Sequence, residues 1–158
     1  MPTQGWRDEP GIAAWSAFLR AHASAVPRVD GEVRRRTGLP LTWYDVLLEL
    51  NAAPGRRLRM HDLGEAVVLS RTRVSRIVDE LVGANFVCRE PNPDDRRSSY
   101  AAITAEGKAQ LRRAAPVYLD AIRKHFVAAL EPQHVSAVEA AMSAVIEYDA
   151  SRVERGAE

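Results

Sequence analysis

The sequence predicts a mainly α-helical protein of the α+β class, in which a winged helix-turn-helix is flanked by N- and C-terminal helices. Three observations support this fold. Apolar residues recur at helical spacing over residues 12–36 and again over residues 104–151. A basic amphipathic helix is expected from Ser70, and two strand-like segments joined by a charged loop follow it. The 158 residues suit one domain with its own core, because 46% of them are apolar.

The first helix is expected over residues 12–36. Its apolar residues are spaced alternately by four and three positions, which gives a narrow seam that suits packing against another helix. The seam consists of Trp15, Leu19, His22, Val26, Val29 and Val33. Pro27 should bend or split the helix, because proline removes a backbone donor.

The next segment supplies the first half of the central module. Gly38-Leu-Pro40 breaks the chain, and Thr42 is expected to cap a second helix, with Asp45 completing a capping box. Residues 56–60 are expected to form a single edge strand beside the wing, and residues 61–68 a short helix. With the helix that begins at residue 70, these elements complete a helix-turn-helix.

The helix from Ser70 has two contrasting faces. Val74, Ile77, Val78 and Leu81 form an apolar stripe, and the opposite side carries Thr72, Ser75, Arg76 and Asp79, with Arg73 at its edge. From Ser70 to Arg76 there are three arginines, three hydroxyl residues and no acid. Such a surface suits the major groove of DNA, because arginines reach guanine edges or phosphates and no carboxylate repels the backbone. The expected contacts are Ser70, Arg71, Thr72, Arg73, Ser75 and Arg76. An ordinary solvated face explains this helix equally well when it is considered alone.

A basic hairpin follows and favours the DNA-binding interpretation. Residues 86–90 alternate like a strand, a turn cluster follows, and residues 98–103 return as a second strand. Arg96 and Arg97 lie at the expected tip, where they can reach phosphate or a narrow minor groove. Asp95 and Arg97 can share one face of a strand, so Asp95 is expected to orient a wing arginine. The alternative is that Asp95 only closes the turn.

Two further helices complete the chain. Asn85 should adopt the left-handed conformation that ends the preceding helix, and Thr104 should cap the next one, which runs to about residue 130 and is kinked at Pro116. Pro132 opens the last helix, which is expected to end near Ser151. We expect a single domain over residues 1–158. It contains dimerisation helices at 12–36 and 104–151 and a winged module at 38–103, because a second copy would bury the terminal apolar stripes.

These motifs together resemble the MarR (multiple antibiotic resistance regulator) family of transcription factors. The wing carries the pattern Asp95-x-Arg97-x5-Ile103-Thr104-x2-Gly107, and the segments Ser70–Leu81 and Arg59–Ala66 resemble the family's recognition and positioning helices. Asn85 departs from the pattern, because family members usually have glycine there. The resemblance covers nearly the whole chain. It implies a triangular homodimer, acting as a repressor on a pseudo-palindromic operator in double-stranded DNA.

The resemblance also implies a small-molecule effector. Family members often bind small aromatic acids between the dimerisation helices and the winged module. Trp15, His22, Trp43 and Tyr44 would line such a site in this chain. Ordinary core or seam packing is the simpler explanation for any one of these residues, and no feature identifies a ligand.

Several other classes of function and site are not supported by the sequence. The four histidines have no metal-ligand spacing, and the nucleophile-elbow and nucleotide-loop motifs do not occur, so no catalytic residue, metal or cofactor is expected. The single Cys88 excludes an internal disulfide and is expected to be a small buried residue rather than a redox sensor. With neither a membrane span nor a signal peptide in the sequence, we expect a cytoplasmic protein without a membrane partner.

The alternative to a DNA-binding regulator is a winged-helix module that binds another protein and no DNA. The net charge of +1 does not discriminate, because a DNA-binding protein must be basic only on its contact face. The discriminating feature is the combination of arginines on the helix and on the wing. A protein-binding wing would not require both places to be basic.

Overall fold

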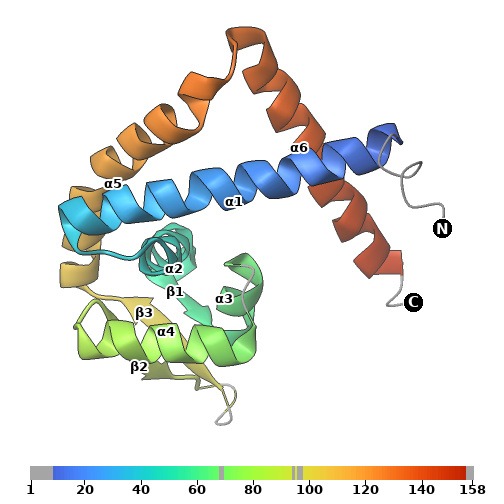
Figure 1. Ribbon diagram of the computed structural model, residues 1–158. Coiled ribbons are helices and arrows are strands. Elements are labelled where there is room, and N and C mark those ends of the chain that lie inside the picture. Colours follow the sequence, from blue (N-terminus) through green and yellow to red (C-terminus); the bar gives the residue numbers. More distant parts are fainter. Residues whose placement is uncertain (1–8, 68–69, 94, 96–97, 156–158) are drawn as a thin grey trace, which may run out of the picture. The chain divides into compact units, whose positions relative to one another are not determined.

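The computed structural model describes residues 9–67, 70–93, 95 and 98–155 (Figure 1). The elements in chain order are the helices, strands and 3-10 turns α1 (Pro10–Thr37), α2 (Leu41–Ala52), η2 (Pro54–Arg56), β1 (Arg57–Arg59), α3 (Met60–Ala66), α4 (Arg71–Gly83), β2 (Val87–Pro91), β3 (Ser99–Ile103), α5 (Ala105–His125), η3 (Val127–Ala129) and α6 (Pro132–Arg155). The chain forms two compact units that divide within α5, between Ala121 and Ile122.

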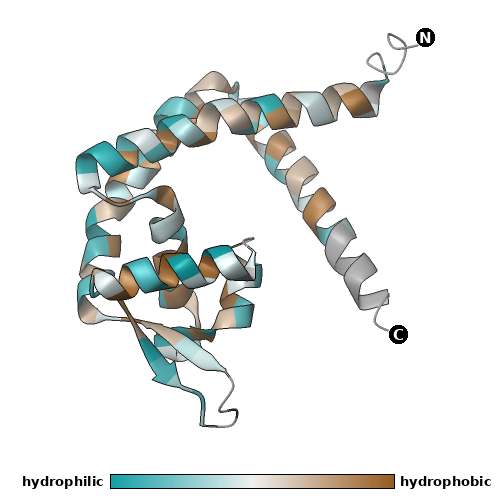
Figure 2. Ribbon diagram, turned by 60° about the horizontal axis from the view of Figure 1, so that its bottom comes forward, coloured by the Kyte–Doolittle hydropathy of each residue, from teal (hydrophilic) through white to brown (hydrophobic). Residues whose placement is uncertain are grey.

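The core of the first unit lies where α2, α3, α4 and α5 pack together with the sheet. Apolar side chains from all of these elements meet there, and the largest fully buried ones in this cluster are Leu39, Leu47, Leu50, Leu63, Leu81, Val46, Val74, Val78 and Val87. Figure 2 shows hydrophobic positions alternating with hydrophilic ones along α4. The apolar stripe predicted for α4 is therefore the face that this helix buries.

The sheet has three antiparallel strands in the order β1-β3-β2. The predicted edge strand beside the wing is confirmed as β1. Val87 pairs with Ile103 on the face that packs on the core, and the next pair, Cys88 and Ala102, therefore lies on the opposite face. Cys88 is exposed, so the prediction that it is buried is wrong. The strand was correctly identified, but its pairing register decides which face each residue occupies.

The start of α2 differs from its prediction. Pro40 occupies the N-cap position without a side-chain cap, and Thr42 lies inside the helix, so the predicted capping box of Thr42 and Asp45 is wrong. Instead, the backbone N–H of Leu41 donates to Asp30 Oδ1 on α1 at 2.7 Å. A carboxylate from another helix therefore satisfies one of the unpaired donors at this helix end.

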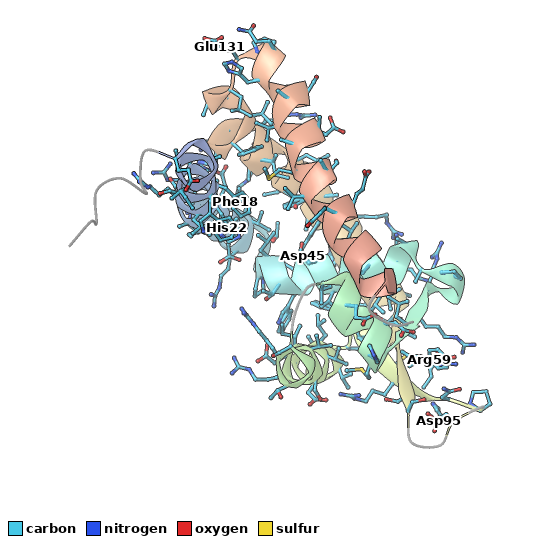
Figure 3. All side chains as sticks on the ribbon, turned by 90° about the vertical axis from the view of Figure 1, so that its right-hand side faces the viewer. Phe18, His22, Asp45, Arg59, Asp95 and Glu131 are labelled. Atoms are coloured by element: carbon cyan, nitrogen blue, oxygen red, sulfur yellow. The ribbon has the colours of Figure 1, made fainter. Side chains whose placement is uncertain are left out.

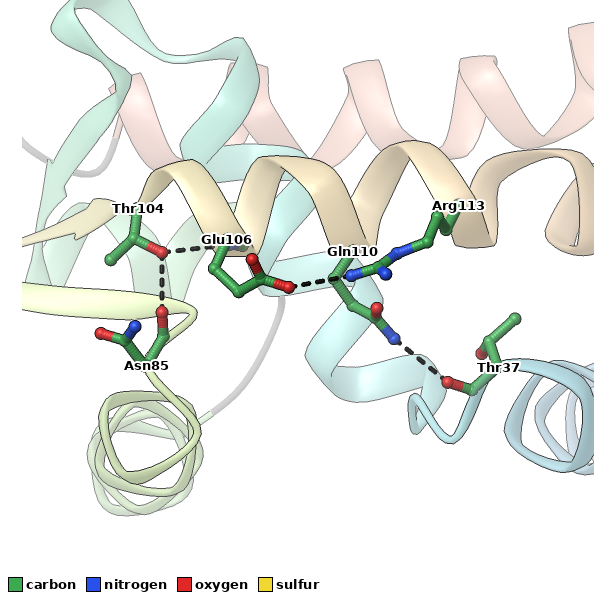
Figure 4. Close-up of polar contacts among 7 residues, drawn as sticks. Thr37, Asn85, Thr104, Glu106, Gln110 and Arg113 are labelled. Atoms are coloured by element: carbon green, nitrogen blue, oxygen red, sulfur yellow. Dashed lines mark hydrogen bonds and ion pairs between the residues drawn. The ribbon is translucent and has the colours of Figure 1, made fainter.

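Helix α1 continues through Pro27 as one helix, so it is not split there. It ends at Gly38, whose φ of 73° lets its N–H donate to Arg34 O at 2.9 Å. Its C-terminal part is held against α5, because Gln110 Nε2 donates to the Thr37 carbonyl at 3.1 Å (Figure 4) and Arg36 Nη1 donates to Asp120 Oδ2 at 3.0 Å.

The junction between α4 and α5 has a hydrogen-bonded cap on each helix. Asn85 has a φ of 61°, as predicted, and the N–H of Phe86 donates to Leu81 O at 2.9 Å to close the end of α4. Thr104 Oγ1 donates to the Asn85 carbonyl at 2.7 Å and accepts from the Gly107 N–H at 3.0 Å, which confirms Thr104 as the cap of α5 (Figure 4).

Gly107 is required at this junction by the close approach of the backbone. A Cβ at this position would lie 2.1 Å from the Phe86 carbonyl oxygen, which is closer than any van der Waals contact. The glycine of the wing pattern therefore has a packing role. It lets the first turn of α5 lie against the backbone that follows α4.

The C-terminal elements differ in length from their predictions. Helix α5 passes through Pro116 and ends at His125, followed by the turn η3, rather than running to residue 130. Helix α6 begins at Pro132, as predicted, and extends to Arg155 instead of Ser151. Over the described part of the chain, no helix combines the length and the hydrophobicity that a bilayer span requires.

Candidate nucleic-acid interface

The outer face of α4 presents polar and basic side chains to solvent. Its orientation is set by the buried stripe on the other side of the helix, where Val74, Val78 and Leu81 are fully buried. Thr72, Arg73 and Arg76 are exposed, and Ser75 is partly exposed. Ser70 occupies the N-cap position, but its side chain makes no capping hydrogen bond. The helix thus holds these five expected contact residues along its exposed side and N-terminal end.

The remaining expected contacts fall outside the part of the chain whose side chains are described. Arg71 is the first residue of α4, but only its backbone belongs to the described structure. Arg96 and Arg97 lie outside the described residues. The wing arginines therefore stay a prediction from the sequence.

Two acidic residues on α4, which are not among the contacts predicted from the sequence, accept hydrogen bonds from neighbouring side chains. Arg76 Nε donates to Glu80 Oε1 at 3.2 Å, and the indole N–H of Trp43 on α2 donates to Glu80 Oε2 at 3.1 Å. Asp79 Oδ1 accepts from Arg89 Nη2 on β2 at 2.7 Å. The spacing of Arg76 and Glu80 by four residues is a signal that the sequence contains. Trp43 lies on α2 and Arg89 on β2, so their contacts with Glu80 and Asp79 have no such local signal in the sequence.

The described part of the wing is closed by a small hydrogen-bond network. Asn92 is buried and donates through Nδ2 to Ser98 Oγ at 2.7 Å. The Ser98 N–H and hydroxyl both donate to the backbone carbonyl of Asp95, at 3.0 and 3.2 Å. The backbone carbonyl of Asp95 therefore takes part in closing the turn.

The outer face of the sheet carries a second group of charges. Arg57 on β1 pairs with Glu90 on β2 at 2.8 Å across the central strand, and its guanidinium carbon lies 4.7 Å from the centroid of the Tyr100 ring. The hydrogen bond to Glu90 raises the pKa of Arg57, so this guanidinium stays charged. Arg59 Nε donates to the Tyr100 hydroxyl at 3.5 Å. Figure 3 labels Arg59 beside the strands and Asp95 farther along the wing.

The four expected effector-binding residues occupy three environments. Trp15 stacks on Phe18 along α1 with ring centroids 5.8 Å apart, and His22 lies on the other side of Phe18 at 6.3 Å (Figure 3 shows Phe18 and His22 together). Trp43 packs edge-on against Phe86 at 6.3 Å. Tyr44 is buried against Tyr118 of α5, with centroids 4.4 Å apart.

The environment of Tyr44 is also acidic. Burial raises the pKa of the neighbouring Asp45 to about 6, and the charges of Glu49 and Asp30 add to this shift. Burial likewise raises the pKa values of Tyr44 and Tyr118, so both phenols keep their protons at neutral pH. Across the described residues, no cluster of three or more His, Cys, Asp or Glu side chains could hold a metal ion.

Comparison with known proteins finds similar regulators. The sequence model that describes the MarR family matches residues 37–98 of this chain. The crystal structure of Sco3205, a MarR family transcriptional regulator from Streptomyces coelicolor in complex with DNA, is 32% identical and has a TM-score of 0.78, covering 85% of each chain. AbsC, a MarR family transcriptional regulator from the same organism, is 28% identical with a TM-score of 0.78, covering 88% of this chain and 93% of AbsC.

One curated protein is also similar over part of its length. The uncharacterized HTH-type transcriptional regulator YkoM of Bacillus subtilis (strain 168) is 29% identical over 68 residues. This match covers 43% of the present chain and 44% of YkoM. The similarity to YkoM therefore concerns less than half of either protein.

Proposed function

The chain belongs to the MarR family of transcriptional regulators, and from that premise we propose that it is a homodimeric repressor that binds a pseudo-palindromic operator in double-stranded DNA. The observation that carries the proposal is the outer face of α4. Its core-facing stripe is fully packed, so the exposed Thr72, Arg73 and Arg76 form a rigid basic edge that fits a major groove. The wing arginines Arg96 and Arg97 would add contacts to phosphate or the minor groove.

The dimer is proposed from the apolar side chains that α1 leaves exposed. Trp15 is 58% exposed, Leu19 45% and Phe18 41%, and the exposed Val26 follows them at helical spacing along the same side of α1. Isolated exposed apolar residues are ordinary, but a contiguous row along a helix favours an interface. A two-fold dimer would present two copies of α4 to two half-sites about one helical turn of DNA apart.

An effector that releases the operator is the third element of the proposal. A small aromatic acid is the proposed ligand, and Trp15, His22, Trp43 and Tyr44 are its proposed contacts. The tilted pair of Tyr44 on α2 and Tyr118 on α5 provides aromatic side chains at this position. An effector of this kind should weaken operator binding when it is added to the complex, as fluorescence anisotropy would measure.

The proposal is tested by selecting duplexes from a random-sequence library with the purified chain. We expect enrichment of an inverted repeat. On the enriched duplex, Arg76→Ala should cost about 1–3 kcal/mol, with little loss on a scrambled duplex. Arg113→Ala is the matched control, because Arg113 is also an exposed arginine paired with a glutamate, at 2.9 Å, on a different helix. Failure to enrich any duplex would favour the alternative, a winged-helix module that binds protein only.

A further inference from the structure

We infer that Glu80 is a positioning residue that fixes the guanidinium of Arg76 for base recognition, and that Trp43 on α2 holds Glu80 in place. This inference rests on the proposed function, because it concerns how α4 would distinguish one DNA sequence from another. It assigns a role in specificity to an acidic residue beside the basic residues of α4. It also extends the determinants of specificity to a residue on α2.

The contact between Arg76 and Glu80 alone would carry little weight. The two side chains lie one turn apart on α4, and the Arg76 side chain is 82% exposed. Exposed pairs of this kind contribute little, because ordering two long side chains offsets most of the attraction. A second contact that already orders the glutamate changes this balance.

Trp43 supplies that second contact. Its indole N–H donates to Glu80 Oε2, while Oε1 accepts from Arg76, so both carboxylate oxygens are engaged by different donors. The indole itself is half-buried and packs edge-on against Phe86 with an interplanar angle of 80°. A tryptophan packed on the core has few alternative rotamers, so the carboxylate receives a fixed position from α2 rather than from α4 alone.

The geometry leaves the base-recognising end of Arg76 available. Glu80 engages Nε, and the Nη1 and Nη2 hydrogens at the end of the guanidinium can still form the paired hydrogen bonds that guanine accepts at O6 and N7. Ordering the arginine before binding reduces the rotamer entropy lost when the complex forms. Glu80 therefore improves binding to the correct sequence, although its own charge repels phosphate.

These two effects of Glu80 have opposite signs and can be separated experimentally. Removing the carboxylate should strengthen binding to any DNA if charge dominates, because one repulsion disappears. Removing it should weaken binding to the selected duplex if orientation dominates. The ratio of affinities for the selected and scrambled duplexes is therefore the quantity that reports positioning.

The test measures that ratio for Glu80→Gln and Trp43→Phe, alone and combined with Arg76→Ala. We expect Glu80→Gln to lower the ratio about three- to tenfold and Trp43→Phe about two- to threefold, with scrambled-duplex binding unchanged or tighter. In the Arg76→Ala background neither change should lower the ratio further. Glu106→Gln, which removes the carboxylate that Arg113 pairs with on α5, is the matched control and should leave the ratio unchanged.

A nuclear magnetic resonance measurement on the DNA-free protein tests the same assignment. The Trp43 indole N–H resonance should shift in Glu80→Gln, and the Arg76 Nε–H should show faster motion in both Glu80→Gln and Trp43→Phe. Thermal unfolding of Trp43→Phe checks that its core is retained, and the exposed Glu80→Gln variant provides an independent test if it is not.

Three results would overturn the inference. They are an unchanged ratio in Glu80→Gln, which includes an equal loss on both duplexes, a higher ratio in that variant, and a lowering of the ratio that persists in the Arg76→Ala background. The last would mean that Glu80 itself accepts a hydrogen bond from a base. If the library yields no enriched duplex, the proposed function fails as well. An enriched duplex with an unchanged ratio overturns the positioning role alone.

Discussion

Helices α4 and α1 are both amphipathic, yet the chain covers the apolar stripe of only one of them. The stripe of α4 is buried completely, with Val74, Val78 and Leu81 at 0% exposure. On α1 the stripe is buried at Val29 and Val33 but exposed from Trp15 to Val26. Both stripes have the same helical period, so the period alone does not distinguish them.

The difference separates surfaces that the chain satisfies by itself from surfaces that need another molecule. The buried stripe of α4 stabilises the module and leaves exposed the polar face that we propose contacts DNA. The exposed stripe of α1 contributes nothing of this kind within one chain, because burial is what makes apolar area stabilising. Mutations in the two regions should therefore change different measured quantities.

The largest effect is expected for Leu19→Glu in the exposed stripe of α1. A charge in the centre of the proposed interface should weaken dimerisation by at least about 2 kcal/mol. Sedimentation should then give the 17.5 kDa chain, while far-UV circular dichroism stays unchanged. Ser24→Glu, on the other side of the same helix, is the control and should leave the dimer intact. A persistent dimer in Leu19→Glu would remove this stripe from the interface.

The next effect concerns the self-contained module. Gly107→Ala should lower the free energy of unfolding by about 1–3 kcal/mol, because the new methyl group would meet the Phe86 carbonyl. Gly83→Ala is the matched control, because a Cβ there has no neighbour within 4 Å. Helix propensity then favours alanine by up to about 1 kcal/mol. Urea unfolding measures the free energy of unfolding of both variants. A stabilising Gly107→Ala would show that the Phe86 backbone shifts to accommodate the methyl group at little cost.

A smaller effect is expected at Asp45, near the buried end of α1. Its pKa is raised to about 6 from an ordinary value of 3.8, so the folded state binds a proton that the unfolded state has lost. The free energy of unfolding should therefore fall as the pH rises from about 4 to about 6. Asp45→Asn should be more stable than the parent by about 1 kcal/mol at pH 7, after allowance for partial exposure, and equal to it at pH 4. A gain that is the same at both pH values would contradict this origin.

The smallest effect concerns the wing, whose partner would also lie outside the chain. We propose that the Asp95 carboxylate orients Arg97. Asp95→Ala keeps the carbonyl that closes the turn, so its effect should come from the carboxylate. It should weaken binding to the selected duplex by about 0.5–1.5 kcal/mol although the protein becomes more positive, and Arg97→Ala should weaken it more. Non-additive losses in the double mutant would support a coupled pair, whereas tighter binding by Asp95→Ala would end the proposal.

The predictions that succeeded rest on patterns local in the sequence. The stripe of α4, the left-handed Asn85 and the Thr104 cap were all predicted from residues within a few positions of one another. Such features succeed because helix period, turn conformation and capping depend on backbone geometry within one or two turns. The same reasoning failed for Thr42, where a carboxylate from α1 took the place of a local cap.

The candidate site was predicted only in part. Its exposed hydroxyl and basic residues follow from the periodicity of α4, but the contact between Trp43 and Glu80 joins residues 37 positions apart. No pattern of composition or spacing indicates that pair. The effector residues show the same limit. Trp43 and Tyr44 are adjacent in the sequence, but Trp43 packs against Phe86, between α4 and β2, whereas Tyr44 packs against Tyr118 of α5.

The sequence by itself determined the order of helices and strands, the buried face of α4 and the basic character of its other face. Only the tertiary structure decided which face of the sheet Cys88 occupies, which residue caps α2, and which acidic group holds Arg76. The physical reason is that periodicity and local capping are encoded within about two helical turns, whereas strand register and long-range hydrogen bonds depend on how the elements pack. The exposed stripe of α1 depends on both, because its pattern is local and the partner that we propose for it lies outside the chain.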